Sequence, residues 1–330
     1  MRVSNPPNSA PLVAVTGGTG FIGRHLVVAL HRAGFRVRLL LRREPDVAEW
    51  RDLPPPEVVA GALDDTAALE RLVEGSDVVV HVAGLIKAAR RSDFMRVNRD
   101  GAAAMAAATA RVAPSARFLL VSSLAAREPQ LSDYAASKRA GEDAVLEQLR
   151  ERAAVLRPPV VYGPGDRETL IFFQLAARRF VPVLGAADAR AAMIHVADLV
   201  RLIAAMARKR AGGGAVRAAA DGRPQGYTWE ELLGAAARAV GNPSPSFVRA
   251  PGALLAGLAL VGDLAKAFGS SSMVSSQKLR ELRHRDWGVT PAERAAAPGW
   301  RPGFDLEHGF ADAVAWYRRA GWLPGSSQRR

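Results

Sequence analysis

Residues 12–23 read LVAVTGGTGFIG, and this stretch decides the fold of the chain. Its first four residues form an apolar run, which is typical of a strand buried on both faces of a sheet. Glycines follow at positions 17, 20 and 23, and apolar residues at helical spacing then predict a helix that ends at Gly34. The apolar run at residues 37–41 predicts a second strand, which completes a strand, loop, helix, strand unit.

The same alternation continues outward from this unit. Apolar runs predict strands at residues 58–60, 78–82 and 118–121, and helical periodicity predicts helices near residues 67–73, 93–110 and 134–152. Because strands of the buried type alternate regularly with helices, we expect an α/β fold built on a doubly wound parallel Rossmann sheet.

The glycine loop has the spacing of a phosphate-binding turn. Gly17 permits the tight turn after the strand, Gly20 lets the backbone approach a pyrophosphate, and Gly23 lets the helix pack closely on the sheet. The phosphates would then lie on free N–H groups at the helix N-terminus. The loop therefore predicts a dinucleotide site, and the alternative is a purely structural glycine turn.

The regular alternation ends after residue 157, where Pro158-Pro159 and the Gly-Pro-Gly-Asp run at residues 163–166 interrupt it. We expect a dinucleotide-binding domain over residues 11–165, with returning elements around residues 191–220. We expect this domain to be interleaved with a smaller, mostly helical C-terminal substrate domain over residues 166–330. Helices of that part are expected near residues 168–179, 196–208, 228–240, 251–268 and 306–318, with short strands near 191–194 and 215–219.

The composition excludes several kinds of protein. The chain has 330 residues and no cysteine, so disulfides, cysteine-ligated zinc, iron–sulfur clusters and a thiol nucleophile are impossible. The net charge of +13 comes from scattered arginines, which favours a charged surface over a nucleic-acid site. The first residues lack a secretory signal, and no window reaches the ~20 apolar residues of a membrane span. We expect a cytoplasmic protein without stable membrane insertion.

The end of the second predicted strand indicates which dinucleotide binds. An acidic side chain there would bind the adenosine ribose, whereas an arginine would accommodate a 2′-phosphate. The strand ends Leu41-Arg42-Arg43-Glu44, and Arg42 occupies the deciding position. This favours NADP over NAD, and the alternative is that Glu44 binds the ribose.

A second group of polar residues follows the strand at residues 118–121. Ser122 and Ser123 lie at its end, and Tyr134 and Lys138 open the next helix. Four residues apart on a helix, Tyr134 and Lys138 share a face, so the ammonium can lie beside the phenol. A nearby cation lowers a tyrosine pKa from its ordinary value of about 10, which makes Tyr134 a usable general acid or base. Ligands bind outside the carboxyl ends of such strands, so we expect the active site here.

Several motifs in order resemble the extended short-chain dehydrogenase/reductase family, the NAD-dependent epimerase/dehydratase group. They are TGGTGFIG, HVAG at residues 81–84, Asn98, VSS at 121–123, YAASK at 134–138, LRPPVVYGPGD at 156–166 and HVADLV at 195–200. The resemblance extends from about Leu12 to Leu199.

The resemblance implies roles for four residues. Tyr134 would donate or accept the proton, Lys138 would lower its pKa and bind the nicotinamide ribose, and Ser123 would orient the substrate oxygen. Ser123 is chosen over Ser122 because the family's catalytic hydroxyl usually comes last in this triplet. Asn98 resembles the asparagine that orders the proton-relay region, and its alternative role is a helix cap.

The resemblance also implies a cofactor site. Its expected residues are Gly17, Thr19, Gly20, Phe21, Ile22, Gly23, Arg42, Leu63, Asp64, Ala83, Gly84, Tyr134, Lys138, Pro158 and Val161. Two departures from the family pattern matter. Ala62 stands where the family's adenine-contacting Asp is common, so Asp64 or the backbone near Leu63 would replace that contact. Val160 stands where sugar-nucleotide members carry an Asn, which argues against a UDP- or GDP-sugar and favours the branches resembling hydroxysteroid dehydrogenases and dihydroflavonol reductases.

We therefore expect an NAD(P)-dependent oxidoreductase that transfers a hydride between nicotinamide and a carbonyl or alcohol carbon of a small, lipophilic substrate. The alternatives are a nucleotide-sugar epimerase or dehydratase that uses bound NAD, and a non-catalytic NADPH-binding accessory subunit. The apolar stretch at residues 251–268 predicts a buried or substrate-lining helix, with an interfacial helix as the alternative. The histidines show no metal-ligand pattern, so no metal is expected, and a homodimer stays open.

Overall fold

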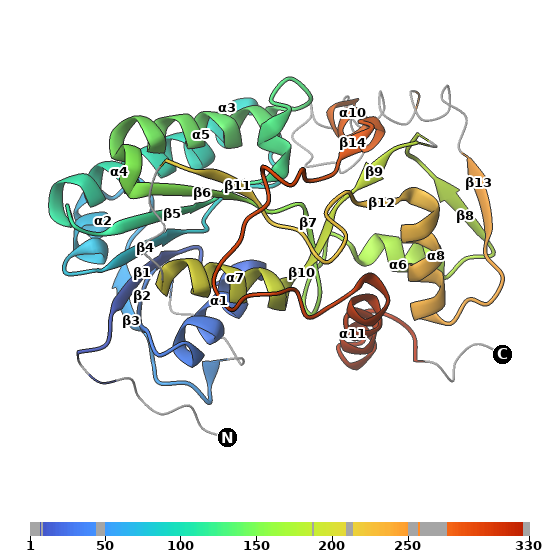
Figure 1. Ribbon diagram of the computed structural model, residues 1–330, viewed down its shortest axis with the longest axis horizontal. Helices are drawn as coiled ribbons and strands as arrows, with labels where there is room; N and C mark the ends of the chain where they lie inside the picture. The colour runs from blue at the N-terminus through green and yellow to red at the C-terminus, as the bar shows by residue number, and fades with distance from the viewer. Residues whose placement is uncertain are drawn as a thin grey trace. The chain divides into compact units, whose positions relative to one another are not determined.

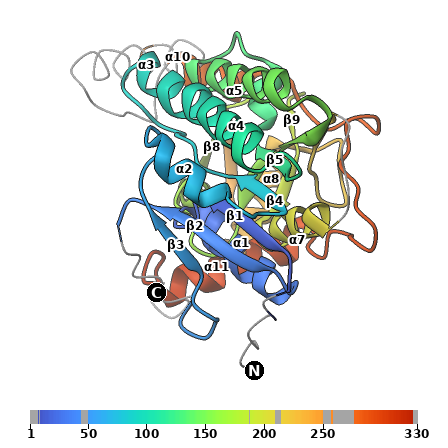
Figure 2. The ribbon, with the colours of Figure 1, turned by 90° about the vertical axis from the view of Figure 1, so that its left-hand side faces the viewer.

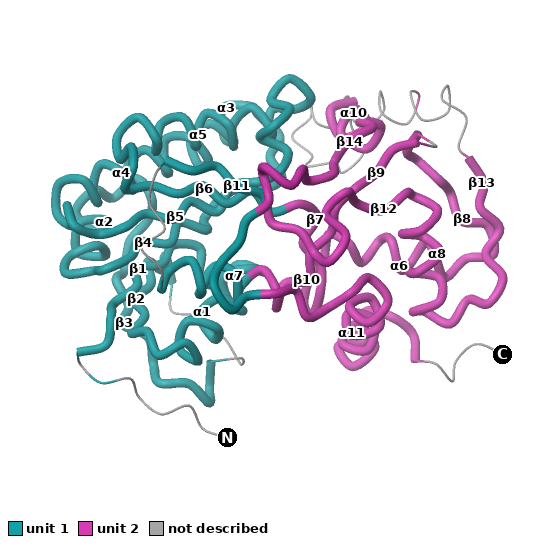
Figure 3. Tube along the Cα trace, in the orientation of Figure 1, with its two compact units in different colours: residues 1–158, 200–218, 295–300 teal, residues 159–199, 219–294, 301–330 magenta. Residues whose placement is uncertain are grey.

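The computed structural model describes residues 9–43, 50–186, 188–208, 214–249 and 276–325, together with positions 7 and 257. The chain forms two compact units (Figure 3). Unit 1 comprises residues 1–158, 200–218 and 295–300, and unit 2 comprises residues 159–199, 219–294 and 301–330.

Unit 1 is built on a seven-stranded parallel sheet (Figure 1). Its strands are β1 (Leu12–Thr16), β2 (Arg36–Leu41), β3 (Glu57–Ala60), β4 (Val78–His81), β5 (Arg117–Val121), β6 (Ala153–Arg157) and β11 (Val216–Ala218). The strands lie in the order β11-β6-β5-β4-β1-β2-β3. Along the chain, successive strands are added on one side of β1 up to β3 and then on its other side from β4 onward. A doubly wound sheet opens a crevice for ligands at this switch point between β1 and β4. The predicted fold class is confirmed.

Helices cover both faces of this sheet (Figure 2). On one face lie α2 (Thr66–Val73), α4 (Gly101–Val112) and α5 (Asp133–Leu149), and on the other α1 (Phe21–Arg32) and the unit 1 part of α7 (Val196–Arg208). Short helical turns follow β5 at Leu124–Arg127 and α5 at Arg150–Arg152, and α3 (Arg91–Phe94) precedes α4.

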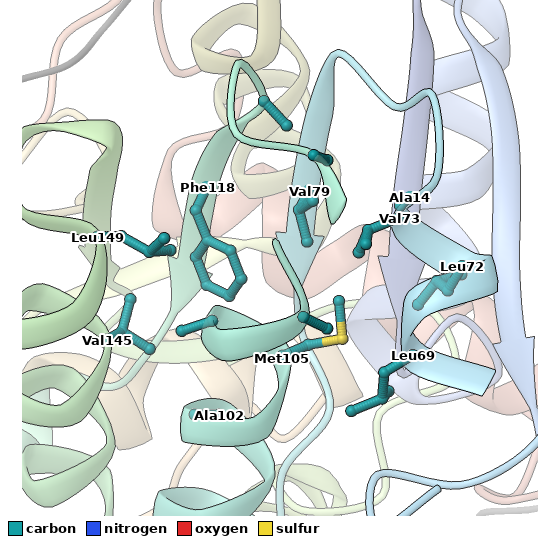
Figure 4. Packing of buried hydrophobic residues seen from close by; sticks show 14 of the residues in the cluster. Ala14, Leu69, Leu72, Val73, Val79, Ala102, Met105, Phe118, Val145 and Leu149 are labelled. Atoms are coloured by element: carbon teal, nitrogen blue, oxygen red, sulfur yellow. The ribbon is translucent and has the colours of Figure 1, made fainter. Parts of the chain in front are cut away.

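The main core of unit 1 lies between the sheet and α2, α4 and α5. Phe118 of β5 is its largest member, and Phe118 and Met105 of α4 are at most 1% exposed. Leu69, Leu72 and Val145 of the neighbouring helices lie around them (Figure 4). Burial of such side chains contributes roughly 1.5–3 kcal/mol each, so this core holds the parallel strands and their carboxyl ends in place.

Unit 2 combines short strands with helices around an aromatic core. The strands are β7 (Val160–Tyr162), β8 (Phe180–Val183), β9 (Arg190–Ala191), β10 (Met193–His195), β12 (Tyr227–Thr228), β13 (Ser246–Arg249) and β14 (Asp286–Trp287). The helices are α6 (Leu170–Ala176), α8 (Trp229–Val240), α10 (Ser276–Arg283) and α11 (Leu306–Arg319). Tyr162, Phe173, Phe310 and Tyr317 pack ring against ring in the core.

Most elements fall where the sequence predicts them. The helices predicted at residues 196–208 and 306–318 are α7 and α11, and the strand predicted at 191–194 is divided between β9 and β10. The strands β7, β8, β12, β13 and β14 were not predicted. The apolar helix predicted at residues 251–268 lies outside the described residues, apart from position 257. No helix in the described part is long and apolar enough to cross a membrane. The domain boundary predicted at residue 165 stays a prediction.

Candidate active site

The glycine loop joins β1 to α1 in a conformation that only glycine accommodates. Gly17 has a φ of +73°, and a Cβ there would lie 2.6 Å from the backbone nitrogen of Ala83. A Cβ on Gly23 would lie 2.0 Å from the carbonyl oxygen of Gly17. The Gly20 amide donates to that same oxygen at 3.0 Å, which closes the turn. Two of the three glycines are therefore required by close backbone approach.

The start of α1 fits a pyrophosphate. Gly20 is the N-cap residue, no side chain caps the helix, and its first turn contains no acidic residue. Thr19 and Gly20 are exposed, and Phe21 and Ile22 are half-buried. The first N–H groups of a helix without a side-chain cap are available to an anion, and the helix dipole favours its charge. The loop thus suits the diphosphate of a dinucleotide.

The residues expected to bind the adenosine half follow β2 and β3. Arg42 is exposed directly after β2. Glu44, which would bind the adenosine ribose in the alternative prediction, lies outside the described residues. Asp64 is exposed, whereas Leu63 is half-buried and would contact a Cβ on Gly101 at 2.8 Å. Leu63 therefore packs against the start of α4, and of these two residues Asp64 has the solvent-exposed polar side chain.

At the end of β4, His81 ties the glycine loop to the neighbouring strand. Its Nδ1 pairs with the Thr16 hydroxyl at 2.9 Å, and that hydroxyl also lies 3.4 Å from the Ala83 nitrogen. Burial lowers the pKa of His81 to about 3, and the charge of Lys138 acts in the same direction. His81 is therefore neutral at physiological pH and positions the backbone around Ala83.

Asn98 lies inside a helix and does not cap one. It belongs to a π-helical stretch, Met95–Asp100, that continues from α3 into α4. Its Oδ1 accepts from the Leu85 nitrogen at 2.8 Å, and its Nδ2 donates to the Leu85 oxygen at 2.9 Å and to Ser137 Oγ at 2.9 Å. The helix-cap alternative is wrong, because the side chain is used to hold the β4 loop against α5.

The two serines after β5 differ in their surroundings. Ser123 is half-buried, and its hydroxyl accepts from the Ala125 nitrogen at 3.2 Å, capping the turn Leu124–Arg127. Ser122 is 7% exposed, and its hydroxyl is buried without a hydrogen-bond partner in the described part of the chain. The choice of Ser123 as the catalytic hydroxyl stays a prediction, and its greater exposure is compatible with contact to a substrate.

Tyr134 and Lys138 occupy successive turns at the start of α5. Ser132 caps this helix by accepting from the Ala135 nitrogen, and Tyr134 is half-buried with its ring 6.1 Å from that of Phe94. Lys138 is 7% exposed, and its Nζ donates to the carbonyl oxygen of Val121, the last residue of β5, at 3.0 Å. Burial lowers the pKa of Lys138 to about 8.

Gly84, Asn98 and Lys138 come together at this edge of the sheet. A Cβ on Gly84 would lie 3.0 Å from Asn98 Oδ1 and 3.6 Å from Lys138 Nζ, so a side chain at position 84 would fill the space around the ammonium. This absence of a side chain leaves room beside Lys138 for a polar group such as a ribose. Pro158 is buried after β6, and its oxygen accepts from the Leu124 nitrogen at 2.8 Å. Val161 is half-buried in β7 of unit 2.

Sequence reasoning missed two buried pairs that support these residues. Thr16 with His81 joins β1 to β4, and Glu142 with Arg157 joins α5 to β6. Both carry a weak signal in the sequence, because Thr16 directly follows one predicted buried strand, His81 lies near the end of another, and Glu142 lies four residues after Lys138 on the same helix face.

The family motif HVADLV serves the packing of unit 2. Asp198 is fully buried and accepts from the backbone nitrogens of Gly303 and Phe304 at 3.0 Å, and the His195 ring stacks on Phe304 at 3.9 Å. These contacts hold the segment that leads into α11. In the part of the chain that the structure describes, no group of three His, Asp or Glu side chains converges on a metal position.

Known proteins resemble this chain over most of its length. A sequence profile described as the NAD dependent epimerase/dehydratase family matches residues 13–218. A ceramide reductase of Caulobacter vibrioides is 50% identical over 315 residues, which cover 95% of this chain and 96% of that protein. A ketoreductase of Stigmatella aurantiaca, whose name specifies a farnesylated dihydroquinoline oxide, is 31% identical over 231 residues. The matched region covers 64% of this chain and 68% of that protein.

Solved structures share the fold. The Bordetella bronchiseptica enzyme WbmH in complex with NAD+ has a TM-score of 0.68 and 21% identity, over 94% of this chain and 99% of that one. At that identity the likeness concerns the arrangement of strands and helices, which agrees with the seven-stranded parallel sheet of unit 1.

Proposed function

Because this chain belongs to the NAD-dependent epimerase/dehydratase family and is an NAD(P)-dependent oxidoreductase, we propose that it reduces a ketone of a ceramide-type lipid to the secondary alcohol. The observation that carries this substrate class is the 50% identity to a ceramide reductase, which extends over nearly the whole of both chains. The exposed apolar Val160, at the position where sugar-nucleotide members carry an asparagine, supports a lipophilic substrate.

The chemistry of the site selects the carbon that reacts. A ceramide contains one amide carbonyl and a secondary alcohol on its long-chain base, and a ketone at the latter carbon accepts a hydride far more readily than the resonance-stabilised amide does. When bound, the nicotinamide dinucleotide supplies that hydride. The residues of this chain therefore need to bind the cofactor, hold the ketone oxygen and deliver one proton to it.

The side chains at the end of β5 and the start of α5 would perform these steps. Ser123 donates a hydrogen bond to the ketone oxygen, and Tyr134 transfers its phenolic proton to that oxygen as the alkoxide develops. Lys138 stabilises the resulting phenolate with its ammonium, which the Val121 carbonyl orients. The glycine loop and the start of α1 hold the diphosphate, and the space beside Gly84 admits the nicotinamide ribose.

We propose NADP as the preferred cofactor, with NAD binding more weakly. The support is Arg42, which is exposed immediately after β2, at the position where an arginine accommodates the 2′-phosphate.

The test uses the purified chain, NADPH and a short-chain ketone analogue of ceramide. Loss of nicotinamide absorbance should accompany formation of the secondary alcohol, identified by mass spectrometry. Tyr134→Phe should lower turnover by roughly 10² to 10⁴, the usual scale for general acid catalysis, while NADPH affinity stays nearly unchanged.

Three outcomes would contradict the proposal, each in its own way. Full activity of Tyr134→Phe would remove that residue from proton transfer. Turnover of UDP-sugars without any response to lipid ketones would make the chain a nucleotide-sugar epimerase or dehydratase. Tight NADPH binding with no turnover of any carbonyl or sugar nucleotide would indicate a non-catalytic cofactor-binding subunit.

A further inference from the structure

Glu142 is a carboxylate in the core of unit 1. Its side chain is 1% exposed, and it lies one helical turn after Lys138 on α5. Burying a carboxylate is costly unless it is paired and hydrogen-bonded. The proposed chemistry assigns Glu142 no role, so its presence in the interior needs another explanation.

Arg157 pairs with this carboxylate through both of its oxygens. Arg157 Nε donates to Oε1 at 2.9 Å and Nη2 donates to Oε2 at 2.5 Å, with the Arg157 side chain 13% exposed. A bidentate pair of this kind holds the carboxylate in one orientation. Because Arg157 is the last residue of β6, the pair fixes α5 to the edge of the sheet where β5 ends.

Lys138, a residue of the candidate active site, lies one turn before Glu142 on the same face of α5. Burial lowers its pKa to about 8, and the negative charge of Glu142 acts against that lowering. The charge of Lys138 also acts on the neutral His81 at the end of β4, and Tyr134 lies one turn earlier on the same helix. Among these neighbours, Glu142 is the one that supplies negative charge.

We propose that Glu142 is a positioning residue of the active site, which keeps Lys138 in its ammonium form while Arg157 holds the carboxylate in place. Without that charge, the buried lysine would lose its proton near neutral pH and could no longer stabilise the Tyr134 phenolate. The inference rests on the chemistry proposed for Tyr134 and Lys138 and is independent of the lipid.

The direct test is a titration of Lys138 in the cofactor-free chain. The sequence contains five lysines, so ¹³Cε-lysine labelling gives few signals, and Lys138→Met identifies the one that belongs to Lys138. In Glu142→Gln, which keeps the shape and removes the charge, the midpoint of the Lys138 titration should fall by about one pH unit, the size of effect expected from one nearby opposite charge.

The same helix offers a matched control. Asp143 pairs with Arg139 four residues earlier, with the spacing of Lys138 and Glu142, but the two side chains are 61% and 45% exposed. Asp143→Asn should leave the Lys138 midpoint within about 0.3 pH units, because solvent and salt screen an exposed charge.

A second variant keeps the test decisive if Glu142→Gln leaves Arg157 unpaired and the protein unstable. Glu142→Gln with Arg157→Gln removes both charges, and the midpoint should still fall, by less than in the single variant. An unchanged midpoint in this folded double variant would overturn the proposal.

Enzyme kinetics supply the second readout. In Glu142→Gln, the high-pH limb of kcat/KM for ketone reduction should shift to lower pH together with the Lys138 titration. In Asp143→Asn, the limb should stay at the same pH. A fall in the NMR midpoint with no activity toward lipid ketones would support the role of Glu142 and reject the substrate. If activity falls in Glu142→Gln while the Lys138 titration midpoint and the pH of the high-pH limb of kcat/KM stay unchanged, Glu142 has only a structural role.

Discussion

Lys138 is a cation in a place that disfavours charge. It is 7% exposed, and burial lowers its pKa to about 8. Since one pKa unit corresponds to about 1.36 kcal/mol, keeping this ammonium charged at neutral pH costs a few kcal/mol relative to an exposed lysine. Perturbed groups of this kind concentrate at functional sites, because the burial that makes the charge unfavourable also strengthens its effect on a neighbouring phenol.

Arg42 carries the first prediction. If its guanidinium pairs with a 2′-phosphate, NADPH should bind roughly tenfold or more tightly than NADH, because a charge-assisted hydrogen bond contributes about 1.5–3 kcal/mol. The preference should shrink as salt rises. Arg42→Ala should bind both cofactors about equally, as measured by fluorescence titration, and Arg43→Ala is the matched control. Equal affinities in the wild type, or an unchanged preference in Arg42→Ala, would contradict this role.

His81 predicts how stability depends on acid. Its pKa is about 3 in the folded chain and ordinarily 6.5, so between these values the unfolded chain binds a proton that the folded chain does not. Unfolding then takes up a proton, and the free energy of unfolding should fall by roughly 2 kcal/mol from pH 6 to pH 4 on account of this group.

The comparison is with His81→Asn, which leaves an amide oxygen near the position of the ring Nδ1 and has no proton to gain. Urea unfolding of the two proteins at several pH values should show a shallower acid dependence in the variant. Burial also lowers the pKa of His31, so part of the dependence should persist. Parallel curves for the wild type and His81→Asn would show that His81 does not contribute.

The turn between β1 and α1 makes the next prediction. Gly23→Ala adds a Cβ 2.0 Å from the Gly17 oxygen, so the helix must move away from the loop, and we expect dinucleotide affinity to fall at least tenfold. Gly234→Ala in α8 is the control, because its Cβ would contact only the flexible end of Arg238, at 3.4 Å. There, alanine should stabilise unit 2 by up to about 1 kcal/mol. Similar cofactor affinities in the two variants would contradict the close-packing argument.

Elements with strong periodicity could be predicted from the sequence. The central strands β1, β4 and β5 contain runs of three or four apolar residues, and α7 and α11 present clear apolar faces. In unit 2, the strands β8 and β13 were not predicted, because Phe180 and Val248 face solvent and the two sequences do not alternate apolar with polar residues. Their pairing depends on contacts distant in sequence, which local patterns do not encode.

The candidate site shows the same limit. The motif residues were found because their types and spacing carry chemistry, as with Tyr134 and Lys138. The role of Asn98 was left open, because an asparagine before an alanine-rich segment suits a cap as well as an interior contact, and only the fold brings Leu85 to its side chain. Glu142 was not among the predicted residues, since nothing near it in the sequence indicates that Arg157 would pair with it.

The two units divide the predicted residues between them. Every predicted catalytic residue and nearly every cofactor residue belongs to unit 1, whereas Val160, Val161 and the apolar segment at residues 251–268 belong to unit 2. Substrate selectivity should therefore depend on residues of unit 2, whereas hydride and proton transfer should depend on residues of unit 1. The net charge of +13 also attracts anions generally, so a substrate test must separate that attraction from specific binding.

A homologous series of ligands makes that separation. If the pocket gains affinity by burying hydrocarbon, each CH₂ added to a short-chain ketone analogue contributes about 0.8 kcal/mol, so KM should fall roughly fourfold per CH₂ until the pocket is filled. These values should depend little on salt, whereas UDP or UDP-glucose would bind through phosphate and weaken as salt rises. The analogues must stay below their aggregation concentration, and kinetics with NADPH give KM at two ionic strengths. Chain-length independence, together with micromolar, salt-sensitive binding of UDP, would reject the lipid substrate and leave the nucleotide-sugar activity as the better explanation.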